Sequence, residues 1–135
     1  MSAVRFDRDA ERNVIGGILS AAAYGPDAGR RIFDRARAAG VTAESFYSHS
    51  LGAIWTELER LREAEIALDA VTVSAQIERR AEERMGVIGE LLAFDVADLR
   101  ARLHELAHEV TAFSNVEHHA AIVVREAERR SWEAA

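Results

Sequence analysis

Apolar residues recur at three- and four-residue steps through most of the chain, which is the spacing of amphipathic helices. The densest pattern falls between residues 44 and 77, and its first helix is predicted to bury Leu51, Ile54, Trp55, Leu58 and Leu61. Ser48 stands before this helix as a candidate N-cap, and Asp69 stands before a second one. Leu68 and Val73 flank Asp69 at the spacing of a hydrophobic staple. The pattern therefore predicts two consecutive helices.

The second helix has a rival interpretation as a strand, because four apolar residues alternate with polar ones: Val71, Val73, Ala75 and Ile77. No other segment alternates in this way. A lone strand would leave its backbone donors and acceptors without a ladder partner, so the helix is the favoured prediction.

An earlier helix is predicted behind Asp7 or Asp9, with an apolar stripe formed by Val14, Ile15, Ile18, Leu19 and Ala22. Gly16 and Gly17 lie in its middle, where each costs roughly 1 kcal/mol relative to Ala. We expect another helix to approach closely there. A phosphate-binding loop would need a preceding strand and Gly-x-Gly spacing, and the sequence has neither.

Residues 24–27 hold the only proline and predict a loop, followed by a short helix over 28–39 that Gly40 closes at its C′ position. Residues 85–94 are dense in apolar side chains, but Gly86 and Gly89 weaken a helix there. We expect this segment to be irregular or to form a short helix.

The last third of the chain steps by four and three and predicts an antiparallel two-helix hairpin over residues 96–133. Ser114 and Glu117 form a capping box that restarts the helix. The predicted seam consists of Leu99, Leu103, Leu106, Val110, Val116, Ala120, Val123 and Ala127. Three apolar residues fall off this seam and require another surface: Ile122, Val124 and Trp132.

Three motifs follow one another along the chain. The opening reads DAERNVIGGIL over 9–19. The central stretch has Phe46-Tyr47, then Ile54-Trp55, then a D-x-[VI]-T-[VL] helix start at Asp69. The end reads LHELAHEVTAFSNV over 103–116, followed by AAIV over 120–123 and two arginines at 129–130.

In this order and spacing the three motifs resemble the N-terminal domain of the bacterial replicative hexameric helicase of the DnaB type. The opening is similar to that family's E-A-E-x-x-V-L-G-x-[LM]-L. The end is similar to its Y-L-x-x-L…N-I…Y-A-x-I-V…R.

The chain also departs from the family pattern. A histidine that the family usually places in the central helix is Leu51 here, with His49 two residues earlier. The family's Gly-Gly before its Y-L pair is missing, and residues 81–102 look longer than the corresponding segment. These departures argue against close orthology and not against the fold.

The resemblance implies a non-catalytic collar that organises helicase subunits into a ring and docks primase or helicase-loading proteins in DNA replication. In that family the corresponding hairpin pairs with a second subunit. We therefore expect a homo-oligomer, formed as a dimer through residues 96–133 and extended to a hexamer as a trimer of dimers, with Ile122, Val124 and Trp132 at the interface. A stand-alone regulator of a helicase encoded elsewhere remains an alternative.

Composition fits one all-α domain over residues 1–135, with a small helical bundle over 7–94 continuing into the hairpin. All 17 basic residues are Arg. The absence of Lys excludes a Walker A loop and Schiff-base chemistry. The net charge is −6, with arginines interleaved among glutamates, so no direct DNA binding is expected.

Apolar runs are too short for a membrane span and no signal peptide is present, so a cytoplasmic protein with no membrane association is predicted.

His104, Glu105 and His108 form a literal H-E-x-x-H, the spacing that binds zinc in metalloproteases. A zinc-dependent hydrolase is therefore the alternative from another functional class. The two histidines fall between seam positions, however, which points them outward, and Thr111 and Ser114 stand where a metzincin has Gly and His. His118 and His119 are predicted to be surface residues. We expect no catalytic residue, no metal and no cofactor.

Overall fold

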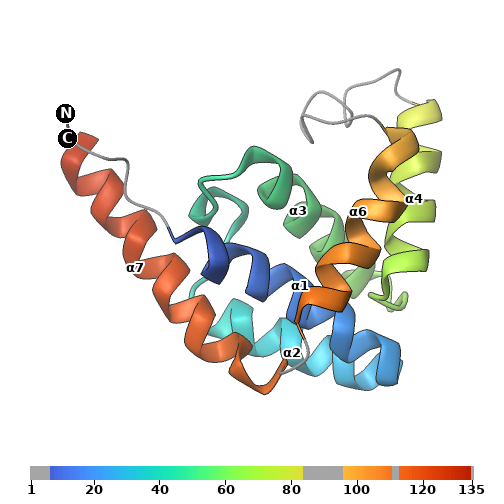
Figure 1. Cartoon of the computed structure of the whole chain (residues 1–135), viewed down its shortest axis with the longest axis horizontal. Helices are drawn as coiled ribbons and strands as arrows, with labels where there is room; N and C mark the ends of the chain where they lie inside the picture. Colours follow the sequence, from blue (N-terminus) through green and yellow to red (C-terminus); the bar gives the residue numbers. More distant parts are fainter. Residues whose placement is uncertain (1–6, 84–95, 111–112, 135) are drawn as a thin grey trace.

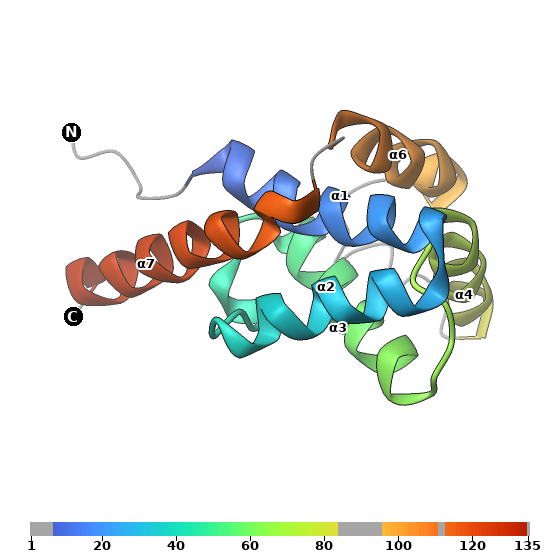
Figure 2. The same cartoon turned by 90° about the horizontal axis from the view of Figure 1, so that it is seen from below.

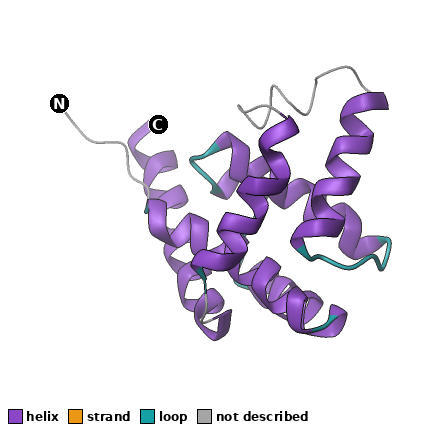
Figure 3. Ribbon diagram, turned by 45° about the vertical axis from the view of Figure 1, so that its right-hand side comes forward, coloured by secondary structure: helices purple, strands orange, loops and turns teal. Residues whose placement is uncertain are grey.

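A computed structural model describes the chain over residues 7–83, 96–110 and 113–134. Every regular element of the described residues is helical (Figure 3), which confirms the all-α prediction. The elements are α1 (Arg8–Tyr24), α2 (Pro26–Ala38), η1 (Ala43–Ser45), α3 (His49–Glu63), α4 (Ala70–Glu83), α6 (Val96–Glu109), η2 (Phe113–Asn115) and α7 (Val116–Ala134). The segment 85–94, for which we expected an irregular or short helical course, lies outside the described residues. None of the described helices is both long and apolar enough to cross a membrane.

Three of the predicted helix starts, those of α1, α3 and α4, are confirmed by their side-chain caps, whereas Ser114, predicted to cap the last helix, lies within η2. Asp7 accepts a hydrogen bond from the Ala10 amide at 2.9 Å, and Ser48 accepts one from the Leu51 amide at 3.3 Å. Asp69 accepts one from the Thr72 amide at 2.9 Å. Each cap satisfies a backbone donor that the first helical turn leaves without a partner. The residues once considered for a strand therefore form α4, with Leu68 and Val73 fully buried on either side of the cap.

Helix α2 begins two residues earlier than the sequence predicts, because the loop before it consists of Gly25 alone. Pro26 takes the first helical position, where its missing N–H is not needed. At the other end Gly40 has φ +104°, in the left-handed region, and closes the helix as predicted.

Helix α1 lies at the centre of the molecule and packs against α2, α3, α6 and α7 (Figures 1 and 2). Its apolar stripe is fully buried, as are the largest side chains that α2 and α3 contribute to the same core. Among these, the rings of Phe33 and Trp55 stack with their centroids 4.6 Å apart. The core therefore lies around the first helix.

Two glycines allow this central position. A Cβ built on Gly16 would collide with the Leu106 carbonyl oxygen and lie 2.7 Å from a methyl group of Val110. A Cβ built on Gly17 would collide with a methyl group of Val116. The close helix approach predicted at Gly16-Gly17 is confirmed, and two helices make it: α6 at the first glycine and α7 at the second.

The predicted pairing of the two C-terminal helices with each other is wrong. Helices α6 and α7 are present, but they diverge (Figures 1 and 2) and make at most marginal contact with each other. Instead α6 packs on α1 and α4, and α7 packs on α1 and α2. The predicted seam residues are buried except for Ala127, which is half-buried, so the apolar stripes were identified correctly. Both helices pack on α1 instead, because Gly16 and Gly17 let them approach its backbone closely.

Candidate functional site

The H-E-x-x-H residues lie on the outer side of α6. His104, Glu105 and His108 are exposed, whereas Leu103 and Leu106 between them are buried against the rest of the fold. Across the described ranges, no group of three or more His, Asp or Glu side chains is placed to hold a metal ion. The motif therefore follows from the amphipathic pattern of a surface helix.

His118 and His119 open α7 and are not brought into a ligand group with the α6 histidines within the described residues. Their rings lie 5.5 Å apart at a steep angle. His119 is half-buried, and its Nε2 lies 3.5 Å from Asn13 Nδ2. This contact links α7 to α1 and is structural in character.

The three residues predicted for an interface fall into two groups. Ile122 and Val124 are half-buried and pack against the core of their own chain. Methyl groups of Val124 would lie 3.7 and 3.8 Å from a Cβ placed on Gly40, so they face the end of α2. Trp132, in contrast, is 82% exposed near the end of α7. Of the three, Trp132 presents the largest area to a partner.

Sequence reasoning missed Glu11, which is only 2% exposed. Its carboxylate accepts hydrogen bonds from the amides of Tyr47 at 3.0 Å and Ser48 at 3.1 Å. Because these amides precede the N-terminus of α3, the negative charge also meets the positive end of that helix dipole. Glu11 therefore fixes the entry of α3 from α1, and the only sequence signal for this role is the D-A-E at 9–11, which is similar to the family's E-A-E.

The same turn is held from its other side by α7. Arg130 donates to the Ser45 carbonyl oxygen at 2.8 Å, and its guanidinium lies 5.6 Å from the centre of the Tyr47 ring. These contacts tie the end of the long C-terminal helix to the aromatic turn before α3. The arginine pair near the C-terminus thus has a structural use.

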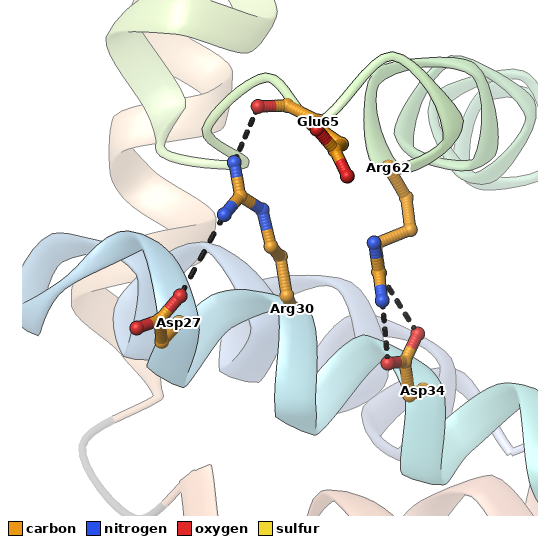
Figure 4. A network of polar contacts seen from close by, with 5 residues as sticks. All are labelled: Asp27, Arg30, Asp34, Arg62 and Glu65. Atoms are coloured by element: carbon orange, nitrogen blue, oxygen red, sulfur yellow. Dashed lines mark hydrogen bonds and ion pairs between the residues drawn. The ribbon is translucent and has the colours of Figure 1, made fainter.

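Helix α2 is joined to α3 by one ion pair and to the turn after α3 by a hydrogen bond (Figure 4). Two nitrogens of Arg62 donate to the two Asp34 oxygens, each at 3.0 Å, and the hydrogen bond from Arg62 is the main cause of a lowered pKa at Asp34. Arg30 Nη1 lies 3.6 Å from Asp27 Oδ1 in an ion pair. Arg30 Nη2 also donates a hydrogen bond to the Glu65 carbonyl oxygen. That bond holds the turn in which Glu65 adopts φ +60°, a conformation that few non-glycine residues take.

A cavity of about 470 Å³ lies between η1, α3 and α4. Its walls are mainly apolar and include Phe46, Gly52 and Ile77. One ion pair lines it, with Glu57 Oε2 3.5 Å from Arg80 Nε, and burial raises the pKa of Glu57. Among the described residues that line the cavity, none is placed as a nucleophile beside a base.

A family model described as "DnaB-like helicase N terminal domain" matches residues 4–125 of this chain. The chain belongs to that family. The DnaB-type N-terminal domain is the non-catalytic part of a helicase, and the present chain is a collar-like module of this kind. The replication context follows from the family.

Comparison with solved structures gives the same fold for this DnaB-type domain. The crystal structure of the N-terminal domain of DnaB helicase from Mycobacterium tuberculosis is similar with a TM-score of 0.75 at 23% sequence identity. The alignment covers 98% of this chain and 81% of that one. No curated protein sequence matches the chain.

The motifs that resembled the DnaB type can now be interpreted physically. The opening motif is α1, where Glu11 caps α3 and Gly16-Gly17 admit α6 and α7. The central motif supplies the aromatic turn and the buried Ile54 and Trp55. These residues shape the DnaB-type fold.

Proposed function

We propose that this chain serves as an oligomerisation and docking module in a replicative helicase assembly and that it catalyses no reaction itself. The observation that carries the proposal is the family match over residues 4–125, which includes all of α1 and about the first half of α7. Such a module places its subunits in a ring and presents a surface to primase or to a helicase loader. It works in the cytoplasm and leaves DNA contacts to other parts of the assembly.

The proposed self-association surface is the outer side of α7, centred on Trp132. A large side chain left mostly in water forgoes roughly 1.5–3 kcal/mol of burial free energy. A second copy related by a twofold axis recovers this burial free energy, because the same patch of both copies packs together. Ile122 and Val124 contribute the area that their own chain leaves uncovered. The dimer so formed extends to a hexamer as a trimer of dimers.

Light scattering of the wild type and of Trp132→Glu tests this surface. We expect the wild type to form dimers or larger assemblies at tens of micromolar and the variant to be a folded monomer, since a buried unpaired carboxylate opposes association. Val71→Glu is the matched control, because Val71 is a 54% exposed apolar residue on α4, away from α7. A monomeric wild type, or equal dissociation by the control, contradicts the proposal.

A further inference from the structure

A small hollow lies between one face of α2 and the turn η2. Its volume is about 220 Å³, and it is lined by Ala28, Arg31, Ile32, Arg35, Phe113 and Ser114. Ile32 is buried, and the side chains of Ala28 and Phe113 are half-buried against the core. The hollow therefore has an apolar floor.

Aromatic surface extends from this hollow toward the end of α1. The ring of Tyr24 lies 5.5 Å from that of Phe113 at 56°, a tilted arrangement. Tyr24 is 79% exposed, one of the most exposed large apolar residues in the described part of the chain. An apolar partner side chain that entered the hollow would thus meet an aromatic ring at its edge.

The rim of the hollow carries positive charge that no described acidic residue neutralises. Arg31 and Arg35 are exposed and lie one helical turn apart on α2, so their guanidinium groups share a face. The acidic residues of α2 are engaged elsewhere: Asp27 pairs with Arg30, and Asp34 pairs with Arg37 and Arg62. No ion pair of Arg31 or Arg35 with another described residue is present. The two charges remain available on a chain whose net charge is −6.

We propose that this hollow docks an acidic peptide segment of a partner protein. One large apolar side chain of the segment enters between Ile32 and Phe113, and carboxylates beside it pair with Arg31 and Arg35. The inference rests on the proposed docking function and specifies the chemistry of the segment that is docked. Arginine suits this role because its planar fork pairs with a carboxylate through two hydrogen bonds.

The size and charge of the hollow favour a peptide over other ligands. Pockets for small molecules usually enclose about 300–1,000 Å³, so a smaller hollow suits a single side chain. Nucleic acid binding draws its affinity from many neutralised phosphates, whereas this face offers two arginines on an acidic chain. The tilted rings of Tyr24 and Phe113 also give no flat platform on which successive bases could stack.

The test titrates the full chain with a fluorescein-labelled peptide that carries one phenylalanine flanked on each side by alternating Glu and Asp. Binding is followed by anisotropy at about 0.05 M salt, where screening is weak, and amide shifts map the contact. We expect the shifts to cluster around Ile32 and Phe113. The double variant Arg31→Glu/Arg35→Glu should bind about tenfold more weakly or worse, a loss of at least ~1.4 kcal/mol. Replacing the peptide's phenylalanine with serine should also weaken binding severalfold.

Two controls separate site-specific pairing from a general charge effect. Arg8→Glu/Arg60→Glu makes the same change in net charge on other exposed arginines and should leave affinity unchanged. A peptide in which Arg and Lys replace Glu and Asp should bind the Arg31→Glu/Arg35→Glu protein more tightly than it binds the wild type. Failure of this charge swap overturns the proposal.

Two further outcomes also overturn it. One is an acidic peptide that does not bind at millimolar concentration. The other is a single-stranded oligonucleotide that binds more tightly than the peptide and shifts the same amides. Light scattering of the same samples reports self-association separately. A protein that assembles but ignores the peptide therefore fails this inference alone, and the assembly function stands.

Discussion

At the scale of single residues, a buried acid connects elements that are distant in the chain. Glu11 of α1 accepts two backbone hydrogen bonds at the start of α3, and its side chain is almost completely removed from water. A carboxylate that accepts bonds from backbone amides forms stronger bonds than a neutral acceptor. The position of α3 on α1 therefore depends on one side chain that contributes little apolar contact.

Truncation of this side chain should be strongly destabilising. Glu11→Ala leaves the amides of Tyr47 and Ser48 without an acceptor, and each such loss costs about 1–3 kcal/mol. We expect a decrease of about 2–4 kcal/mol in the free energy of unfolding, measured by urea titration. Glu11→Gln keeps one acceptor oxygen and should cost clearly less. Equal stability of the two variants would show that the hydrogen bonds are unimportant.

The Asp34–Arg62 pair predicts a pH dependence. The pKa of Asp34 is lowered in the fold, so its ionised form stabilises the native state, and this contribution is lost as pH falls through the folded-state pKa. Both side chains remain partly exposed, so Asp34→Asn should cost only about 0.5–1 kcal/mol at neutral pH. The difference from the wild type should be complete above about pH 5 and fade in stronger acid. Urea titrations across pH measure it, and a difference that does not change with pH would contradict the assignment.

At the scale of helices, the arrangement depends on where backbones approach closely. Gly16 and Gly17 would be unfavourable in an isolated helix, because each lowers helix propensity by roughly 1 kcal/mol relative to Ala. In the fold they are the points at which α6 and α7 cross α1. The low helix propensity of glycine therefore disfavours α1 at these positions, whereas the close packing of α6 and α7 requires glycine there. The packing decides which residue stands at these positions.

Alanine substitutions at Gly16 and Gly17 measure the balance between helix propensity and close packing. Gly16→Ala and Gly17→Ala should each destabilise the fold by about 1–3 kcal/mol net, because forced overpacking outweighs the gain in propensity. Gly25→Ala is the control, since a Cβ there meets nothing within 4 Å and its φ of 168° is extended backbone. Thermal unfolding of the three variants decides the matter. A more stable Gly16→Ala protein would mean that α6 can move away without loss.

Helix positions were predictable from sequence because periodicity and capping are local. Ser48, Asp69 and Gly40 each act within one turn of their own position, and the structure confirms all three. The partner of each apolar stripe was not predictable in this way. The stripes of α6 and α7 fit each other by pattern, and only the three-dimensional placement of Gly16-Gly17 shows that both fit α1 better. The Glu11 bonds were missed for the same reason, since they span more than thirty residues.

At the scale of the whole molecule, the proposed function is that of a binding surface. Family membership was foreseen from motif order, because the motifs are the residues that determine the fold. The candidate interface residues were harder to rank by exposure from the sequence. Trp132 and Val124 look alike in a helical pattern, and only tertiary packing leaves the first in water and sets the second against the end of α2.

The exposed histidines give a prediction at this scale. Protein purified without chelator should carry no stoichiometric zinc and show no peptidase activity, because His104 and His108 lie on an open helix surface with no third ligand among the described residues. Elemental analysis and a casein assay are the measurements. One zinc per chain, with activity that Glu105→Gln abolishes, would restore the hydrolase interpretation.

The central position of α1 also governs how the domain can be made in the cell. Arg12 and its ion-pair partner Glu109 are 97 residues apart in the chain, and α7 follows later still. A ribosome that adds about 5–20 residues per second therefore exposes the first helix for about 5–20 s before these partners emerge. Of the described helices that pack on α1, α2 and α3 alone have emerged during that interval to cover its apolar stripe. The native fold is thus completed only once α6 and α7 have emerged from the ribosome, and a nascent chain stalled before α6 becomes a substrate for chaperones.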